Sequence, residues 1–200
     1  MSRLPRSFFR RDPVSVAKSL LGQRLVRIDH GQRLAGLIVE TEAYLGIPDR
    51  AAHTFGGRRT ARVASMWKDG GTAYVYFTYG MHYCMNVVAG NIGEPVAVLL
   101  RALEPVNGLD IMCINRGGLD RAAALCSGPA KLCAALNITR EQDGLDLAAS
   151  HALFIERVRR SEYPPEQIIT TARVGVSYAQ EWAHKPLRFY LKNNPYVSRK

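Results

Sequence analysis

The spacing of apolar and polar residues predicts many short strands with helices inserted between them. Residues 23–28 and 34–43 read as strands, because apolar and β-branched side chains recur there between turn residues. The turn-prone stretch Asp29-His30-Gly31 separates them, so we expect the two strands to pair as antiparallel neighbours.

Helix signals are fewer and local. Asp12 suits an N-cap and Pro13 a first turn, which predicts a helix that follows them and stops at Gly22. Ser127 is expected to cap a helix that begins at Pro129. The remaining elements that the pattern predicts are strands at 95–103, 152–158 and 172–176, and helices at 106–114 and 121–125.

Four tyrosines fall within the thirteen residues from Tyr74 to Asn86. The β-prone residues of this stretch are interrupted at Tyr79-Gly80, where glycine accepts a positive φ, so the pattern predicts a β-hairpin with a large aromatic residue at its tip. Two readings of Tyr79 stay open at this point. Its ring lies in the core, as most large aromatic rings do, or it is exposed to contact something flat.

The order of elements determines the fold class. Strands outnumber helices, and no internal repeat or low-complexity segment interrupts residues 1–200. We therefore predict a single α+β domain: a curved, largely antiparallel sheet with surrounding helices and a protruding β-hairpin. A chain of 200 residues with 47% hydrophobic content can bury such a core without disulfides or metal.

Charge adds a candidate partner. The 27 Lys and Arg residues exceed the 17 acidic ones, which gives a formal net charge of +10 and favours a polyanion such as nucleic acid. Many basic proteins use such charge only for solubility. The four cysteines form no CxxC pair, so we expect reduced thiols and neither a zinc site nor a redox motif.

The sequence has no feature of a membrane or secreted protein. The first eleven residues are too polar for a signal peptide, and no run of about 18 apolar residues is present. We therefore expect an intracellular protein with no membrane partner.

Charged residues in apolar strands suggest chemistry. Glu40 and Glu42 lie two apart, so they point to the same side of a strand, and one of them is a candidate general base. The alternative is that both are solvated or bonded to arginines. Arg101 lies within a predicted buried strand and must be paired or face a site.

The segment 45–71 is long and irregular, which in compact domains is typical of function or disorder. It contains His53 and the basic residues Arg58, Arg59, Arg62 and Lys68, which suit contact with phosphates or with solvent alone. A lone histidine here is more often structural than catalytic. A phosphate could also rest at the start of the helix after Ser127, near Lys131, although a plain capped helix fits equally well.

A set of short motifs runs in order through nearly the whole chain, from about Phe9 to Ser198. The motifs are Val39-Glu-Thr-Glu-Ala-Tyr-Leu-Gly46, Arg50-Ala-Ala-His53, Gly56-Gly57-Arg58, Tyr74-Val-Tyr76, Tyr79-Gly-Met81, Cys84-Met-Asn86, Leu99-Leu-Arg-Ala-Leu-Glu-Pro105, Cys126-Ser-Gly-Pro-Ala-Lys-Leu-Cys133 and Lys185-Pro-Leu-Arg-Phe-Tyr190. Together they resemble the alkyladenine (3-methyladenine) DNA glycosylases, the single-domain type unrelated to the helix-hairpin-helix glycosylases.

The resemblance implies a role for each site residue. Glu42 would be the general base that activates a water, with Arg101 beside the reacting nucleotide and Glu40 only in support. The pocket for the flipped base would be formed by Tyr44, His53, Tyr76 and Asn86, with Asn86 placed to oppose the exocyclic amine of guanine. Tyr79 would wedge into the duplex and Met81 would pack against the neighbouring base step. Contacts to the DNA backbone are expected from Arg58, Arg59, Ser127 and Lys131.

The implied activity is base-excision repair of double-stranded DNA that contains damaged purines. The expected substrates are alkylpurines such as 3-methyladenine, together with hypoxanthine and ethenoadenine. No lysine matches a Schiff-base position in the family, so the resemblance implies a monofunctional hydrolase, acting as a monomer, with no metal and no organic cofactor.

Two other classes are weighed against it. A metal-dependent hydrolase using Glu40, Glu42 and His53 is disfavoured, because these residues show no compact ligand spacing. A non-catalytic nucleic-acid-binding module would explain the charge and the aromatic residues. It would not explain Glu42 in a region that faces phosphates, where a carboxylate weakens binding.

Overall fold

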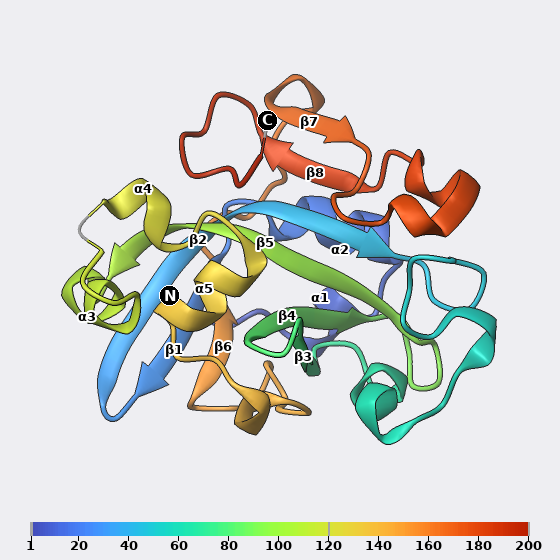
Figure 1. Ribbon diagram of the computed structural model, residues 1–200, viewed down its shortest axis with the longest axis horizontal. Helices are drawn as coiled ribbons and strands as arrows, with labels where there is room; N and C mark the ends of the chain where they lie inside the picture. Colours follow the sequence, from blue (N-terminus) through green and yellow to red (C-terminus); the bar gives the residue numbers. More distant parts are fainter. Residues whose placement is uncertain (1, 120, 200) are drawn as a thin grey trace.

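An eight-stranded antiparallel sheet forms the centre of the protein (Figure 1). The structure is a computed structural model that describes residues 2–119 and 121–199. The main path of the sheet is β3-β4-β5-β2-β1-β6, and β8 joins it by pairing with both β2 and β7. The strands are β1 (Arg24–Asp29), β2 (Gln32–Tyr44), β3 (Ala73–Thr78), β4 (His82–Ala89), β5 (Val96–Asn107), β6 (Leu153–Glu156), β7 (Ile168–Thr171) and β8 (Arg188–Leu191).

Short helices surround this sheet, and the α+β class expected from the sequence is confirmed. In Figure 1, α2 lies behind β2 and α5 lies in front of β4 and β5. The α-helices are α1 (Arg6–Phe9), α2 (Pro13–Leu20), α3 (Leu109–Asn115), α4 (Ala122–Leu125) and α5 (Pro129–Ala135). The 3-10 helices are η1 (Phe55–Gly57), η2 (Ala61–Trp67), η3 (Arg140–Gln142), η4 (Pro165–Gln167) and η5 (Ser177–Ala183).

Local rules explain the best-predicted elements. The Asp12 side chain accepts a hydrogen bond from the Ser15 N–H, so α2 begins with the expected cap and with Pro13 in its first turn. β1 and β2 pair antiparallel around the turn at His30 and Gly31, both of which have positive φ. The main core is formed where α2 and the helices α3–α5 pack against the sheet, and its fully buried residues include Leu20, Ile38, Leu100 and Leu103.

β2 is the strand on which the site is built. At Glu40–Glu42 it lies between β5 on one side and β8 on the other, so its carboxylates are at the centre of the sheet. The register with β5 shifts twice around Glu40, and Arg101 falls between the paired residues Leu100 and Ala102. Such bulges re-aim side chains, and here the irregularity accompanies an arginine turned toward two glutamates.

The tyrosine hairpin is formed by β3 and β4, and Tyr79 is exposed at its tip. Tyr79 and Gly80 both have positive φ, 52° and 68°, as the turn between the strands requires. The side chain of Tyr79 is 85% exposed, whereas Tyr74 in the same hairpin is 1% exposed. The reading that placed Tyr79 in the core is therefore wrong.

Three local predictions fail for identifiable reasons. The helix predicted at 106–114 begins only at Leu109, because β5 continues to Asn107 in order to pair with Ala35. The N-cap of α5 is Gly128, with φ 153° and no side-chain cap, and not Ser127. No strand forms at 172–176. The strand in this region is β7, which ends at Thr171, and the residues after it turn so that the Val174 N–H reaches Glu42 of β2.

The thiols and the lengths of the helices can be read from the structure. All four cysteines are free, and three of them are buried. Among the described residues, no helix has the length and apolar character needed to cross a bilayer.

The core assignment can be tested with two aliphatic truncations. Leu100→Ala in β5 should lower the free energy of unfolding by about 2–5 kcal/mol, because it leaves a cavity beneath α2. Ile92→Ala removes a side chain that is 72% exposed and should change it by less than about 0.5 kcal/mol. Urea unfolding followed by circular dichroism measures both, and equal losses would contradict the assignment.

Candidate active site

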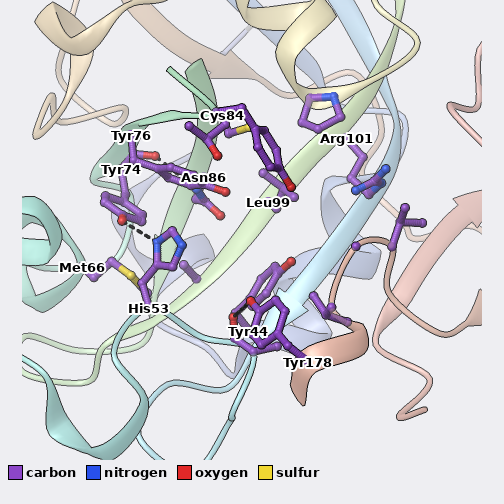
Figure 2. A pocket seen from close by; sticks show the side chains of 18 residues that line it. Tyr44, His53, Met66, Tyr74, Tyr76, Cys84, Asn86, Leu99, Arg101 and Tyr178 are labelled. Carbon is purple, nitrogen blue, oxygen red and sulfur yellow. Dashed lines mark hydrogen bonds between the residues drawn. The ribbon is translucent and has the colours of Figure 1, made fainter. Parts of the chain in front are cut away.

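A cavity of about 370 Å³ opens on the face of the sheet formed by β2, β4 and β5. Figure 2 shows His53, Tyr74, Tyr76 and Asn86 on one side of it, and Tyr44, Tyr178 and Arg101 on the other. The cavity therefore has two largely aromatic walls with a space between them. Its lining residues are Tyr44, Ala51, His53, Met66, Tyr74, Tyr76, Thr78, Tyr79, Cys84, Asn86, Ala97, Leu99, Arg101, Pro129, Val174, Gly175, Val176 and Tyr178.

Glu42 lies directly behind the Tyr44 wall and is fully buried. Its Oε1 accepts a hydrogen bond from the Val174 N–H at 2.8 Å and lies 3.3 Å from Arg101 Nη1. Its Oε2 accepts from the Tyr44 hydroxyl at 2.9 Å. A carboxylate can accept about four hydrogen bonds, so both oxygens retain capacity for a water.

Burial dominates the acidity of this carboxyl group. It raises the pKa of Glu42 above its ordinary value, although Arg101, the Val174 N–H and the Tyr44 hydroxyl all act in the opposite direction. A carboxylate with a raised pKa is a stronger base than an exposed one, provided it stays ionised. Arg101, whose pKa is itself raised by the two glutamates against the effect of burial, supplies the charge that favours ionisation.

Arg101 joins the two glutamates that the sequence singled out. Its Nε donates to Glu40 Oε1 at 3.1 Å while Nη1 faces Glu42. Glu40 also accepts from Arg188 Nε at 2.6 Å. Both glutamates contact Arg101, which confirms that they point to the same side of β2. The alternative that both are solvated is wrong, because both are fully buried, and the alternative that they are bonded to arginines is confirmed.

His53 forms the opposite wall and has a partner. Its Nδ1 lies 2.8 Å from the Tyr74 hydroxyl, the bond drawn in Figure 2, and its ring packs edge-on against Tyr76 with centroids 4.5 Å apart. Burial, and then the charges of Arg62 and Arg58, lower the pKa of His53 to about 4. The imidazole is therefore neutral at physiological pH.

A second buried ion pair holds the Tyr44 wall in place. Arg173 donates to both oxygens of Asp49, at 2.6 and 2.9 Å, and both side chains are fully buried. The Arg173 guanidinium also lies 4.6 Å from the Tyr44 ring centroid. Asp49 in turn accepts from the Leu45 and Ala51 N–H groups, so the loop that leads to His53 is folded around it.

Two further residues complete the cavity. Asn86 is buried in β4, where its Nδ2 donates to the Tyr74 carbonyl at 3.3 Å and its side chain faces the cavity. Tyr178, carried by η5, is 66% exposed at the rim, and its hydroxyl donates to the Ala51 carbonyl at 3.4 Å.

The residues expected to contact DNA lie outside the cavity or at its mouth. Tyr79 lines the mouth, and Met81 beside it is 69% exposed. Arg58 and Arg59 are exposed next to η1, with the Arg59 guanidinium stacked 3.7 Å from the Trp67 ring centroid. Lys131 is exposed on α5, and Ser127 is half-buried where it bridges to Ala102.

Sequence reasoning thus identified the residues around the cavity but missed several that support them. Arg173 and Arg188 were considered only as part of the positive charge, because their carboxylate partners lie more than 120 residues away. Val174 contributes a backbone N–H, which no residue type reveals. Tyr178 lies just after the predicted strand 172–176, and only its aromatic character could have drawn attention to it.

Comparison with known proteins agrees with this geometry. The family model of the methylpurine-DNA glycosylases matches residues 7–195. The chain belongs to this family. The resemblance found in the sequence is therefore confirmed, and with it the enzyme class, a glycosylase that hydrolyses an N-glycosyl bond in DNA.

Individual relatives match over nearly the full chain. A putative 3-methyladenine DNA glycosylase of Bacillus cereus (strain AH187) is 46% identical over 203 residues, which cover 98% of each chain. One from Desulfitobacterium hafniense is 45% identical, with 99% of each chain covered. The human DNA-3-methyladenine glycosylase is 47% identical over 99% of this chain and 68% of its own length.

If Glu42 is the general base that the sequence resemblance implies, the pH dependence of glycosylase activity should report its ionisation. Because a general base acts as the carboxylate and burial raises its pKa, the single-turnover rate should fall on the acidic side at a higher pH than an exposed glutamate, about 4.3, would give. Tyr44→Phe removes a hydrogen bond that stabilises the carboxylate and should move this limb to still higher pH.

His53 should cause no change of rate between pH 5 and 8, since its pKa is about 4. Rates measured from pH 5 to 8 with enzyme in excess provide the comparison. A single limb near 6.5 that Tyr44→Phe leaves in place would assign the titration to a histidine and contradict the role of Glu42.

Proposed function

We propose that this protein excises alkylated purines, 3-methyladenine among them, from double-stranded DNA as a monofunctional glycosylase in which Glu42 activates the attacking water. The observation that carries the proposal is a buried carboxylate, Glu42, bonded to Tyr44 and Arg101, two residues that line a cavity with aromatic walls. The names of the relatives, all of them 3-methyladenine DNA glycosylases, support the substrate class.

The aromatic walls suit a flipped base that carries positive charge. Purines alkylated at a ring nitrogen are cationic, and tyrosine ring faces attract cations through their quadrupoles. A protonated histidine would oppose this attraction, and the low pKa of His53 keeps the wall formed with Tyr76 uncharged. Tyr44 provides the other stacking face, while Asn86 opposes the exocyclic amine of guanine.

The proposed reaction needs only water. A water held by Glu42 and Arg101 attacks C1′ of the flipped nucleotide and gives its proton to the Glu42 carboxylate. The N-glycosidic bond breaks and its electron pair leaves with the base, which a positive charge makes a good leaving group. The products are the free base and an abasic site in an unbroken strand. Neutral bases such as hypoxanthine and ethenoadenine are further proposed substrates that depend more strongly on this activation.

Flipping the base requires unstacking, which costs a few kcal/mol. Tyr79 is suited to recover part of that energy, because its exposed ring can fill the vacated position as intercalating side chains do. Met81 would pack against the adjacent base step. The DNA backbone would contact the exposed Arg58, Arg59 and Lys131, together with Ser127. The proposed enzyme acts as a monomer inside the cell.

Glu42→Gln tests the catalytic assignment. Loss of the general base should slow single-turnover base release by about 10²–10⁴-fold, while binding to the lesion-containing duplex is retained. The measurement uses duplex oligonucleotides that each contain one alkylpurine, hypoxanthine or ethenoadenine. Full base release by Glu42→Gln would instead favour the non-catalytic nucleic-acid-binding module, and activity that a chelator abolishes would favour the metal-dependent hydrolase.

Tyr79→Ala tests the wedge. Because the ring is exposed, the free energy of unfolding should change by less than about 0.5 kcal/mol, whereas affinity for a lesion duplex should fall by about tenfold or more relative to undamaged DNA. Tyr83→Ala, in the same hairpin but half-buried, serves as a control for hairpin stability. An unchanged preference for lesion DNA in the folded Tyr79→Ala variant would rule out intercalation by this residue.

A further inference from the structure

The ionic cluster behind the cavity includes a segment far from it in sequence. Glu40 is fully buried, and its carboxylate is held by arginines and by the end of the chain rather than by residues of the aromatic walls. Its Oε1 accepts from Arg101 and Arg188, and its Oε2 accepts from the backbone N–H of Ser198 at 2.7 Å. Among the described residues, the Ser198 N–H is the donor that contacts this oxygen.

Ser198 also contacts Arg101 directly. Arg101 Nη2 donates to the Ser198 Oγ at 3.3 Å, and Arg188 Nη2 donates to the carbonyl of the next residue, Arg199. The three nitrogens of the Arg101 guanidinium therefore have three separate partners: Nε has Glu40, Nη1 has Glu42 and Nη2 has Ser198. A guanidinium held at all three nitrogens cannot rotate without breaking one of these contacts.

We propose that Ser198 is a positioning residue of the active site: its N–H fixes Glu40, its hydroxyl fixes Arg101, and together they hold the Arg101 guanidinium against Glu42. This inference rests on the proposed catalytic role of Glu42. Ser198 lies behind the ionic cluster and does not reach the substrate. Its effect is on the geometry and ionisation of Glu42 and not on binding of the base.

Burial makes these contacts consequential. The Glu40 side chain is 0% exposed and that of Arg101 8%, so their charges are held mainly by protein donors and acceptors. A hydrogen bond to a charged group is stronger than one between neutral groups, and a buried acceptor that loses its donor is destabilised. Without Ser198 N–H, the Glu40 carboxylate can turn toward its remaining donors, and Arg101 moves with it.

Two substitutions separate the two contacts. Ser198→Ala removes the hydroxyl and keeps the N–H, while Ser198→Pro removes both. In single-turnover base release from an alkylpurine duplex, we expect a decrease of about threefold for Ser198→Ala and about 10- to 100-fold for Ser198→Pro. Ser161→Ala and Ser161→Pro, at an exposed serine outside the site, should stay within about twofold of the unmodified protein.

The pH profile distinguishes positioning from a loss of structure. Glu42 is faced by Arg101, Arg173, Glu40 and the Tyr44 hydroxyl. Displacement of Arg101 removes the cation that lowers the pKa of Glu42, so the acidic limb should move to higher pH in both Ser198 variants. The affinity for lesion DNA should remain near that of the unmodified protein. Loss of the buried donor should lower the unfolding temperature by only a few degrees, so both variants remain folded in the assay.

The outcomes are separable. If the unmodified protein releases no base, the proposed function fails. If it is active and both folded Ser198 variants match it in rate and in pH profile, the positioning role is overturned while the proposed function stands. If Ser198→Pro does not fold, Ser198→Ala decides: a shifted limb supports positioning, and an unshifted limb with an unchanged rate overturns it.

Discussion

The structure depends on the burial of two carboxylates side by side in the middle of a sheet. An ionised carboxylate taken out of water is unfavourable unless it is paired, and removing one partner from a buried pair costs about 3–5 kcal/mol. Here Glu40 and Glu42 are matched by Arg101 and Arg188, so the cluster is neutral as a whole. The strand order follows from this requirement, because β5 and β8 bring the two arginines to β2 from opposite sides.

The same requirement fixes the surroundings of the cavity. The Val174 N–H points to Glu42, so the backbone at this point cannot continue a strand. The neighbouring Arg173 then lies against Asp49. Asp49 then folds the loop that leads to His53. One buried acidic residue is thus connected to the opposite wall through a series of hydrogen bonds.

Local patterns were sufficient for the helix after Asp12, the pairing of the first two strands and the tyrosine hairpin, since each depends on neighbours in sequence. They failed where a distant partner decides the conformation. Residues 172–176 have a strand-like pattern, yet no strand forms there, because Arg173 and Val174 are bonded to Ala43 and Glu42. Glu42 and Arg101 could be singled out because charge inside an apolar strand is unusual. Ser198 could not, because nothing in its local sequence indicates a buried partner 158 residues away.

The hairpin tip and the carboxylate cluster differ in one respect that affects how the enzyme can diversify. Glu42 is buried between paired strands, so a substitution there that changes side-chain volume or leaves a partner unpaired affects the packing of the sheet. Tyr79 projects into solvent from a turn that packs against little else. If the tip contacts DNA as proposed, substitutions there can change DNA binding without altering the buried cluster, and the two properties can evolve at different speeds within one small domain.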